Sequence, residues 1–178
     1  MNLNVYIETP RLVIRTLRVE DASEKYARWL GDPEVNHFLE TRQTSVDELR
    51  NYISEKIDLR DTLFLGIFWK ENGDLIHIGN LKFEPCDSAS GIAHMGIILG
   101  EKDFWGRGVA TEVTNASLDY LKKELNIKTV TLGVFAEHVA AIRVYEKCGF
   151  SMDRILPETL IRSGREVHQA FMKKQLYD

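Results

Sequence analysis

The segment EKDFWGRGVATEV, Glu101–Val113, carries residue types that suit the binding of an anion. Gly106 and Gly108 have no Cβ, so a ligand can approach the backbone N–H groups around them closely. A helix is expected to begin directly after the second glycine, and a helix N-terminus attracts phosphate through its free N–H groups and its dipole. Arg107 adds a positive charge. The segment therefore indicates either a phosphate-binding loop or a tight turn that only introduces the helix.

The spacing of the glycines excludes two familiar nucleotide-binding motifs. A Walker A loop requires Gly-Lys-Ser/Thr, and no such tripeptide follows Gly108. The dinucleotide fingerprint GxGxxG requires a third glycine, which this sequence lacks. Taken alone, the segment leaves the binding loop and the simple turn equally open.

The flanking segments predict a strand, a helix and a second strand around this loop. The mostly apolar run Gly91–Leu99 is typical of a central strand. After the loop, apolar residues at helical spacing predict a helix to about Leu125; they are Val109, Val113, Ala116 and Tyr120. Lys128–Phe135 reads as the next strand. This series is typical of a parallel crossover unit, in which the loop lies at the end of the first strand.

The rest of the chain adds strands and helices on both sides of this unit. The other expected strands are Arg11–Leu17, the two arms of a hairpin around Asn72-Gly73, about Met152–Ile161 and about Glu166–Lys174. The other expected helices run from a cap at Asp21 to Leu30, from about Val46 to Leu59, and through HVAAIRVYEKCGF, which Gly149 ends. The order β-α-α-β-β-β-α-β-α-β-β predicts an α/β (α+β) chain with a mixed sheet.

Composition limits the class of protein. The 178 residues favour a single domain, residues 1–178, that is large enough to bury a core. The net charge of −4 gives no reason to expect a nucleic-acid or membrane partner. No signal peptide and no apolar run of about 20 residues is visible, and Cys86 and Cys148 form no CxxC pair. We therefore expect a cytoplasmic protein with reduced thiols.

Several ordered motifs resemble one family. The crossover unit is followed by AEHVAAIRVYEKCGF, Ala136–Phe150, and the series resembles the GNAT N-acetyltransferase superfamily, which transfers acetyl from acetyl-CoA to an amine. The family signature (Gln/Arg)-x-x-Gly-x-(Gly/Ala) lies on Trp105–Ala110, with Trp in place of the usual first residue. The opening TPRLVIRTL and the later WLGDPEV are most similar to the Rim-type branch, the ribosomal-protein N-terminal acetyltransferases and their relatives. The resemblance covers nearly the whole chain.

The resemblance implies a fold and a cofactor site. It implies a mostly antiparallel sheet of about seven strands with about four helices, whose central parallel strands, Gly91–Leu99 and Lys128–Phe135, splay apart. Strand amides would receive the pantetheine arm and the glycine loop the pyrophosphate. The acetyl-CoA contacts implied in this way come from Ile97, Ile98, Leu99, Trp105, Gly106, Arg107, Gly108, Val109, Ala110, Thr111, His138 and Tyr145. No metal is expected, because the thioester is already an activated acyl group.

The implied reaction is direct attack of the amine in a ternary complex. The amine must attack as the free base, although an alkylamine such as lysine has a pKa of about 10.4. A strand amide near Ile98 is the candidate donor to the oxyanion. Tyr145 in VYEKCGF matches the residue that often protonates the leaving thiolate in the family, and a packed helix tyrosine is the alternative. His138 and Ala141 stand where the branch usually has Asn and Ser, which shifts proton handling onto Tyr145.

Two residues are candidates for the general base. His94 lies inside the central strand where relatives often carry Glu, and its ordinary pKa near 6.5 suits proton relay. A single histidine in a strand is more often a hydrogen-bonded structural residue, which is the alternative for His94. Glu84 at the end of a strand is the second candidate. Trp29 and His37 belong to the segment that covers the acceptor site in the family, with core packing as the alternative.

The acceptor is less defined than the donor. A protein N-terminal amine or a nucleotide-linked amino sugar is expected, and Arg42 and Lys82 are candidates for contacting an anionic sugar nucleotide. Polyamines and small antibiotics receive less support. A non-catalytic acetyl-CoA-binding sensor or interaction module is the alternative from a different class. Many relatives form homodimers, so a homodimer is possible here too.

Overall fold

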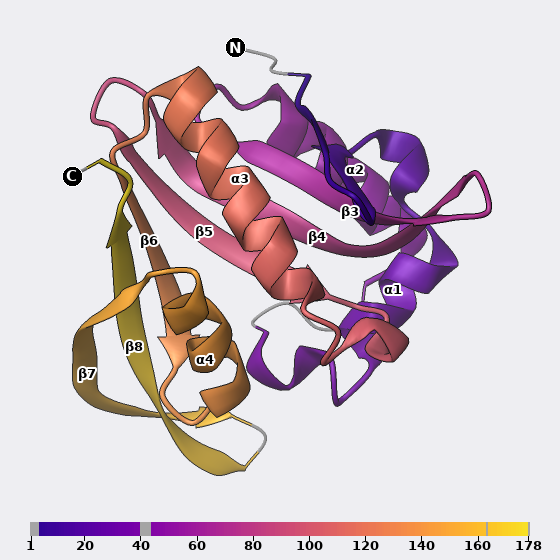
Figure 1. The fold of residues 1–178 in the computed structure, drawn as a ribbon. Coiled ribbons are helices and arrows are strands. Elements are labelled where there is room, and N and C mark those ends of the chain that lie inside the picture. The colour runs from indigo at the N-terminus through magenta and orange to yellow at the C-terminus, as the bar shows by residue number, and fades with distance from the viewer. Residues whose placement is uncertain (1–3, 40–43, 163, 178) are drawn as a thin grey trace.

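The chain folds around one mixed eight-stranded sheet. The computed structural model describes residues 4–39, 44–162 and 164–177. The strands are β1 Tyr6–Glu8, β2 Leu12–Thr16, β3 Leu63–Glu71, β4 Asp74–Asp87, β5 Ile92–Leu99, β6 Thr129–Phe135, β7 Ser151–Arg162 and β8 Arg165–Gln175. Their order across the sheet is β1-β2-β3-β4-β5-β6-β8-β7 (Figure 1). β5 and β6 are parallel and the other neighbouring pairs are antiparallel, which confirms the predicted fold class.

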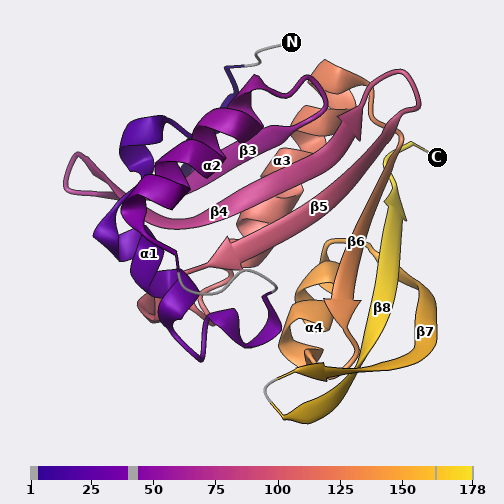
Figure 2. The ribbon, with the colours of Figure 1, turned by 180° about the vertical axis from the view of Figure 1, so that it is seen from behind.

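Helices cover the sheet on both faces. They are α1 Glu24–Gly31, α2 Val46–Asp58, α3 Val109–Leu125 and α4 Val139–Lys147, with short 3-10 turns at Val19–Asp21, Asn36–Phe38 and Lys102–Phe104. α3 and α4 lie in front of the sheet in Figure 1, whereas Figure 2 shows α1 and α2 on the opposite face, over β3 and β4. Among the described residues, no helix is long and apolar enough to cross a bilayer.

Two apolar clusters hold these layers together. The larger one lies between the sheet and α3 and α4, and includes Leu65, Ile67, Leu81, Phe83, Val113, Leu121, Val130 and Leu132. The smaller one lies under α1 and α2, and includes Leu17, Tyr26, Trp29, Leu30, Leu49, Ile53 and Phe64. Alternation along a strand sends successive side chains to opposite faces, so β3 contributes Leu65 to the first cluster and Phe64 to the second. β3 is therefore packed on both of its faces.

The turn between β3 and β4 forms as its sequence predicts. Asn72 and Gly73 have φ values of 51° and 90°, and Glu71 pairs with Asp74 across the two-residue turn. Positive φ at both central residues is the requirement of the type I′ hairpin turn, and Asn-Gly meets it at the least steric cost. The predicted hairpin is confirmed.

The N-terminal part differs from the prediction in two places. The predicted cap at Asp21 is wrong: Ser23 caps α1, with its Oγ accepting from Tyr26 N at 3.2 Å. Asp21 instead accepts two hydrogen bonds of 2.8 Å from Arg15, which commits its carboxylate to the neighbouring strand. The prediction also missed β1, because three residues are too few to display an alternating pattern.

The parallel pair β5–β6 opens toward its C-terminal ends. Residues 92–95 pair with 129–132, and beyond this point β6 pairs only with β8. β5 continues beside β4, where Leu99 is opposite Gly79. Both Figure 1 and Figure 2 show the two strands diverging. The second half of β5 therefore has a backbone edge that β6 does not pair, as the predicted splay requires.

Candidate active site

The glycine loop connects β5 to α3 through two left-handed residues. Gly106 and Gly108 have φ values of 71° and 75°, a region that side chains rarely adopt. A Cβ built on Gly106 would meet no atom within 4 Å, and one on Gly108 would meet only Arg11 Nη2 at 3.8 Å. The backbone conformation therefore explains the glycines, and the space above them is open rather than filled by the chain itself.

The loop presents a run of N–H groups without acceptors. The first hydrogen bond of α3 runs from Glu112 N to Gly108 O at 3.0 Å. Between Gly106 and Thr111, no backbone N–H donates to another residue in the part of the chain that the structure describes. Free N–H groups at the positive end of a helix form an anion-binding concavity. The geometry thus favours the binding loop over the simple turn.

Two side chains flank this concavity. The Trp105 indole Nε1 donates to Leu99 O at 2.9 Å, which ties the loop to the end of β5. The Arg107 guanidinium lies over the Phe104 ring, 5.5 Å from its centroid. The loop therefore has a fixed relation to the strand, and Arg107 stays at the surface where it can meet an anion.

Hydrogen-bond alternation identifies the β5 amides that face the opening. Gly91 O accepts from Thr129 N of β6, whereas Gly100 N donates to Ile78 O of β4. Successive residues of a strand direct their backbone groups to opposite sides. Ile97 and Leu99 thus face the side that β6 has left, while Ile98 faces β4, where it is opposite Asn80. The oxyanion donor near Ile98 stays a prediction; the amides near it that face the opening are those of Ile97 and Leu99.

Tyr145 lies on α4, on the same side of the sheet as α3. It is buried and packs edge-on against Phe150, with 5.9 Å between ring centroids. Burial raises the pKa of Tyr145 to about 12, so the phenol is protonated at neutral pH. Its hydroxyl makes no hydrogen bond to a described residue. Cys148, at the end of the same helix, approaches Thr111 O with its Sγ at 3.8 Å, which joins α4 to the loop.

His94 lies on the opposite face of the sheet. Its Nδ1 is 2.9 Å from Thr131 Oγ1, and that hydroxyl is 3.5 Å from Ala93 O. When the hydroxyl donates to Ala93 O it accepts from Nδ1–H, so this network favours a lone pair on Nε2. Burial lowers the pKa of His94 and the Lys82 charge lowers it further. The imidazole is therefore neutral at neutral pH, as a base must be.

Glu84 is engaged by two lysines. Lys56 Nζ is 2.5 Å from one carboxylate oxygen and Lys82 Nζ is 2.7 Å from the other. Burial alone would raise the pKa of Glu84, but the hydrogen bonds from both lysines outweigh it and hold the pKa below its usual range. The structure brings both base candidates to one face, since Lys82 pairs with Gly96, two residues from His94. We call Lys82, Glu84, His94, Ile98 and Thr131 the His94 face.

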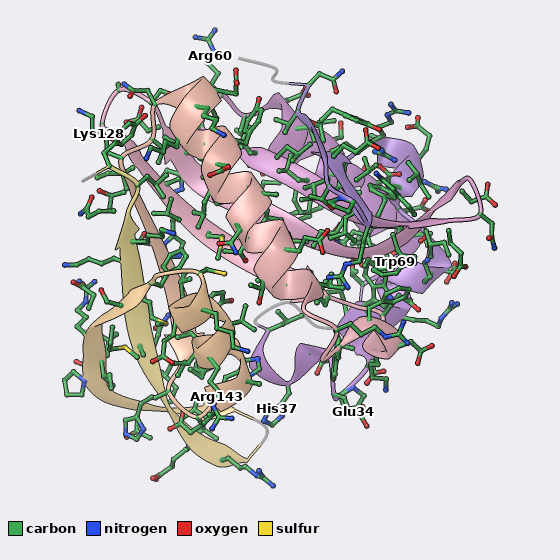
Figure 3. The ribbon with its side chains drawn as sticks, viewed as in Figure 1. Glu34, His37, Arg60, Trp69, Lys128 and Arg143 are labelled. Atoms are coloured by element: carbon green, nitrogen blue, oxygen red, sulfur yellow. The ribbon has the colours of Figure 1, made fainter. Side chains whose placement is uncertain are left out.

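His138 stands at the start of α4, across the opening from the N-terminal helices. Its backbone N donates to Phe135 O at 2.8 Å. Burial lowers the pKa of His138, and the nearby His37 lowers it further. Figure 3 shows His37 and Arg143 at the same end of the molecule, where the segment after α1 approaches α4. These two histidines therefore mark the place at which the N-terminal and C-terminal halves meet.

Trp29 contacts Gly100, a residue that the sequence-based prediction did not connect with it. A Cβ on Gly100 would lie 1.9 Å from Trp29 Cδ2, so only glycine fits under this indole. The indole Nε1 also donates to Glu101 Oε1 at 2.7 Å. Trp29 thus packs in the smaller core cluster and at the same time fixes the residues that follow β5. No local sequence pattern links a tryptophan in α1 to a glycine 71 positions later, so one sequence does not predict this contact.

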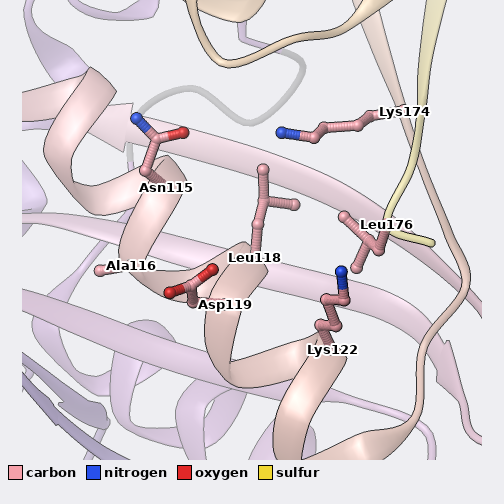
Figure 4. A pocket seen from close by; sticks show the side chains of 7 residues that line it. All are labelled: Asn115, Ala116, Leu118, Asp119, Lys122, Lys174 and Leu176. Atoms are coloured by element: carbon pink, nitrogen blue, oxygen red, sulfur yellow. The ribbon is translucent and has the colours of Figure 1, made fainter. Parts of the chain in front are cut away.

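Two hollows on the described surface lie away from these residues. A groove of about 370 Å³ follows α3 and the end of β8, lined by Asn115, Ala116, Leu118, Asp119, Lys122, Lys174 and Leu176 (Figure 4). A second hollow of about 470 Å³ lies beside α1 and α2, lined by Ala27, Arg28, Gly31, Thr44, Ser45 and Glu48. Neither contains a predicted site residue. Within the described ranges, no group of three or more His, Cys, Asp or Glu side chains is arranged to hold a metal ion.

A family model described as an acetyltransferase (GNAT) domain matches residues 11–151. The chain belongs to the GNAT acetyltransferase family. A GNAT N-acetyltransferase transfers its acetyl group from acetyl-CoA, and the predicted enzyme class is confirmed. The GNAT domain matched here includes the glycine loop, both strands of the splayed pair and α4.

Individual relatives agree with this family. An uncharacterised N-acetyltransferase, p20, of Bacillus licheniformis is 29% identical over 95% of this chain and 96% of its own length. An L-amino acid N-acetyltransferase of Escherichia coli is 25% identical over 58% of this chain and 63% of its own. The crystal structure of spermidine N-acetyltransferase from Vibrio cholerae with CoA and spermine superposes with a TM-score of 0.83 over 94% of this chain and 97% of that one, at 23% identity. GNAT N-acetyltransferases thus share this fold and differ in the acceptors that they are named for.

Proposed function

We propose that this GNAT enzyme binds the pyrophosphate of acetyl-CoA on the N–H groups of residues 106–111 and transfers the acetyl group directly to a primary amine. One observation carries the proposal: these N–H groups have no acceptor among the described residues, at a helix N-terminus beside the opening of β5 and β6. Trp105 and Arg107 would flank the pyrophosphate. The pantetheine arm would follow the amides of Ile97 and Leu99.

The proposed chemistry is a single displacement in a ternary complex. The amine nitrogen attacks the thioester carbon, the new C–N bond forms and the C–S bond breaks. An amide of the second half of β5, at Ile97 or Leu99, stabilises the oxyanion. The leaving thiolate takes the phenol proton of Tyr145. Burial raises the pKa of Tyr145, so the phenol is protonated at neutral pH and holds the proton that the thiolate would take.

We assign the base role to His94 rather than to Glu84. The nitrogen of the attacking amine must lose a proton, which His94 Nε2 takes directly or through a water molecule. His94 is neutral and its Nδ1 is held by Thr131, whereas both carboxylate oxygens of Glu84 are engaged by lysines. His138 would contribute to the cofactor site from the start of α4.

The acceptor classes to test are a protein N-terminal amine, as in the Rim-type branch, and a nucleotide-linked amino sugar. The names of the relatives add amino acids and polyamines. Lys56 and Lys82 place two cationic groups against one carboxylate near His94. This local charge favours an acceptor with an anionic group, such as a sugar nucleotide or an amino acid, over a polyamine. Arg42, the other predicted contact to such a group, lies outside the described residues.

The test is release of free thiol from acetyl-CoA with a panel of amines, namely a peptide, an amino acid, a nucleotide-linked amino sugar and spermidine. Turnover with at least one amine is expected, with the anionic acceptors ahead of spermidine. Binding of CoA by calorimetry is measured in parallel. CoA that binds without turnover of any amine would contradict the enzyme mechanism and favour a sensor module.

A further inference from the structure

Arg11 contacts the glycine loop from the turn before β2, which is distant from the loop in sequence. Its Nε donates to Glu112 Oε2 at 2.7 Å and its Nη2 lies 2.6 Å from the same oxygen. Its Nη1 donates to Arg107 O at 3.0 Å. The guanidinium also lies over the Trp69 ring, 5.5 Å from the centroid. One side chain therefore joins the start of β2, the loop and the first turn of α3.

The second carboxylate oxygen of Glu112 is held as well. Thr9 Oγ1 donates to Glu112 Oε1 at 2.5 Å. Thr9 itself belongs to the turn before β2, where Leu12 N donates to its hydroxyl at 3.0 Å. Burial alone would raise the pKa of Glu112, but hydrogen bonds from Thr9 and Arg11 outweigh it and keep the pKa low. Glu112 is therefore an ionised carboxylate with both oxygens engaged.

The bond from Arg11 to Arg107 O has a consequence for the ligand side of the loop. In a trans peptide the carbonyl oxygen and the following N–H point in opposite directions. Because Arg107 O points at Arg11, the N–H of Gly108 points away from Arg11. Gly108 has a positive φ and α3 begins at the next residue, so this N–H lies at the N-terminus of the helix. Arg11 thus fixes the direction of one of the free donors.

The pair also removes a charge that would oppose the ligand. Glu112 lies in the first turn of α3, next to the N–H groups that would bind pyrophosphate. An unpaired carboxylate there would repel an anion, and it would also compete for the helix N-terminus. Arg11 compensates this charge and draws the carboxylate toward β2.

We propose that Arg11 and Glu112 form a clamp that holds the glycine loop in its CoA-binding conformation. This inference rests on the proposed cofactor site and adds positioning residues to it. Arg11 and Glu112 hold the backbone and neither touches the reacting atoms. Loss of the clamp should therefore weaken the binding of CoA and leave the chemical step intact.

The experiment compares Arg11→Met, Arg11→Lys and Glu112→Gln with the unchanged chain. For Arg11→Met we expect the Kd of CoA and the KM of acetyl-CoA to rise about tenfold, the loss of roughly one charge-assisted contact, with kcat within about twofold. Arg11→Lys should give a smaller rise, because an ammonium reaches Glu112 or Arg107 O but has no fork to bond both. Adding Glu112→Gln to Arg11→Met should raise the Kd of CoA by a smaller factor than Glu112→Gln raises it in the otherwise unchanged chain, because the ion pair is already absent.

The matched control is Arg15→Met. Arg15 lies in the adjoining strand β2, donates two hydrogen bonds to the Asp21 carboxylate and lies over the Phe68 ring, 4.1 Å from its centroid. Its partners among the described residues are Thr16, Asp21 and Phe68, none of which lies on α3, so its loss should lower the Tm while the Kd of CoA stays within about twofold. If Arg11→Met does not fold, Arg11→Lys supplies the comparison.

Two outcomes separate this inference from the proposed function. A folded Arg11 variant with a lower Tm but an unchanged Kd for CoA would overturn the clamp and leave the cofactor site in place. Failure of the unchanged chain to bind CoA would contradict the cofactor site, and the clamp with it.

Discussion

The glycine loop and the His94 face use different parts of the polypeptide to meet a ligand. The loop offers backbone N–H groups that no described residue accepts, on a segment whose shape is set by two left-handed glycines. The His94 face offers side chains, and these already bond one another: Lys82 to Glu84 and His94 to Thr131. A ligand can join the loop without displacing a contact, whereas on the face it must compete with existing pairs. We therefore expect the loop to bind a single acetyl donor, acetyl-CoA, and the His94 face to select among acceptor amines.

Tyr145 gives the largest expected effect, because it is the side chain on the loop side to which we assign a step of the reaction. We expect Tyr145→Phe to lower kcat about 100-fold, since the thiolate then leaves without a positioned acid. The KM of acetyl-CoA should change little, because the ring and its packing on Phe150 remain. Steady-state kinetics measures both constants. An unchanged kcat would show Tyr145 to be a packing residue.

His94→Gln tests the face side of the comparison. We expect kcat to fall about 30-fold. This is less than the usual effect of removing a general base, because water can still take the proton from the amine. The base must be neutral, so activity of the unchanged chain should fall as pH drops through the lowered pKa of His94, below about 6.5. This acidic limb of the pH–rate profile should disappear in the variant. A profile with the same limb would assign it to another group.

Gly108→Ala tests whether the loop acts through its backbone alone. A side chain in the left-handed region costs about 1–2 kcal/mol, and the loop can relieve it only by turning its N–H groups. We expect the Kd of CoA to rise about tenfold. Gly73→Ala is the matched control, because Gly73 also has a positive φ and open space but lies in the β3–β4 turn. It should lower the Tm and leave CoA binding unchanged; equal effects of both variants on the Kd would contradict the role of Gly108.

Lys82→Gln gives the smallest effect and concerns acceptor choice. Lys82 is partly exposed and paired with Glu84, so its charge is worth less than 1 kcal/mol to a ligand. We expect the ratio of kcat/KM for an anionic acceptor to that for a neutral amine to fall about threefold. The KM of acetyl-CoA serves as the internal control and should not change. A ratio that rises would show that the Lys82 charge disfavours an anionic acceptor, which would contradict the proposal.

The same contrast explains how far the sequence predicts the site. The loop lies within one short segment, so its glycines, its helix and the adjoining strand are visible together in the sequence. The type I′ turn at Asn72-Gly73 was predictable for the same reason. The pairing of His94 with Thr131 spans 37 positions and that of Arg11 with Glu112 spans 101. No local pattern encodes such pairs, because they depend on the register of β5 with β6 and on the way the β1–β2 turn meets α3.

The wrong prediction of the residue that caps α1 has a related cause. Asp21 and Ser23 are both good helix caps, and local preference does not choose between them. The choice is made by Arg15, which binds the Asp21 carboxylate from β2. A tertiary contact thus overrides an equal pair of local signals.

The free N–H groups of the loop also have a consequence for divergence among enzymes of this fold. Every residue except proline supplies the same backbone N–H. Most substitutions at these positions therefore alter the side chains around the site and keep its hydrogen-bond donors. Trp105, in a position where the family signature has Gln or Arg, fits this expectation: its indole bonds Leu99 O and the loop keeps its shape. The two left-handed glycines and the buried Val109 restrict the sequence more than the other loop positions do. With acetyl-CoA on the loop and the acceptor on the strand side chains, as proposed, a lineage built on this fold could exchange its acceptor and inherit its acetyl donor unchanged.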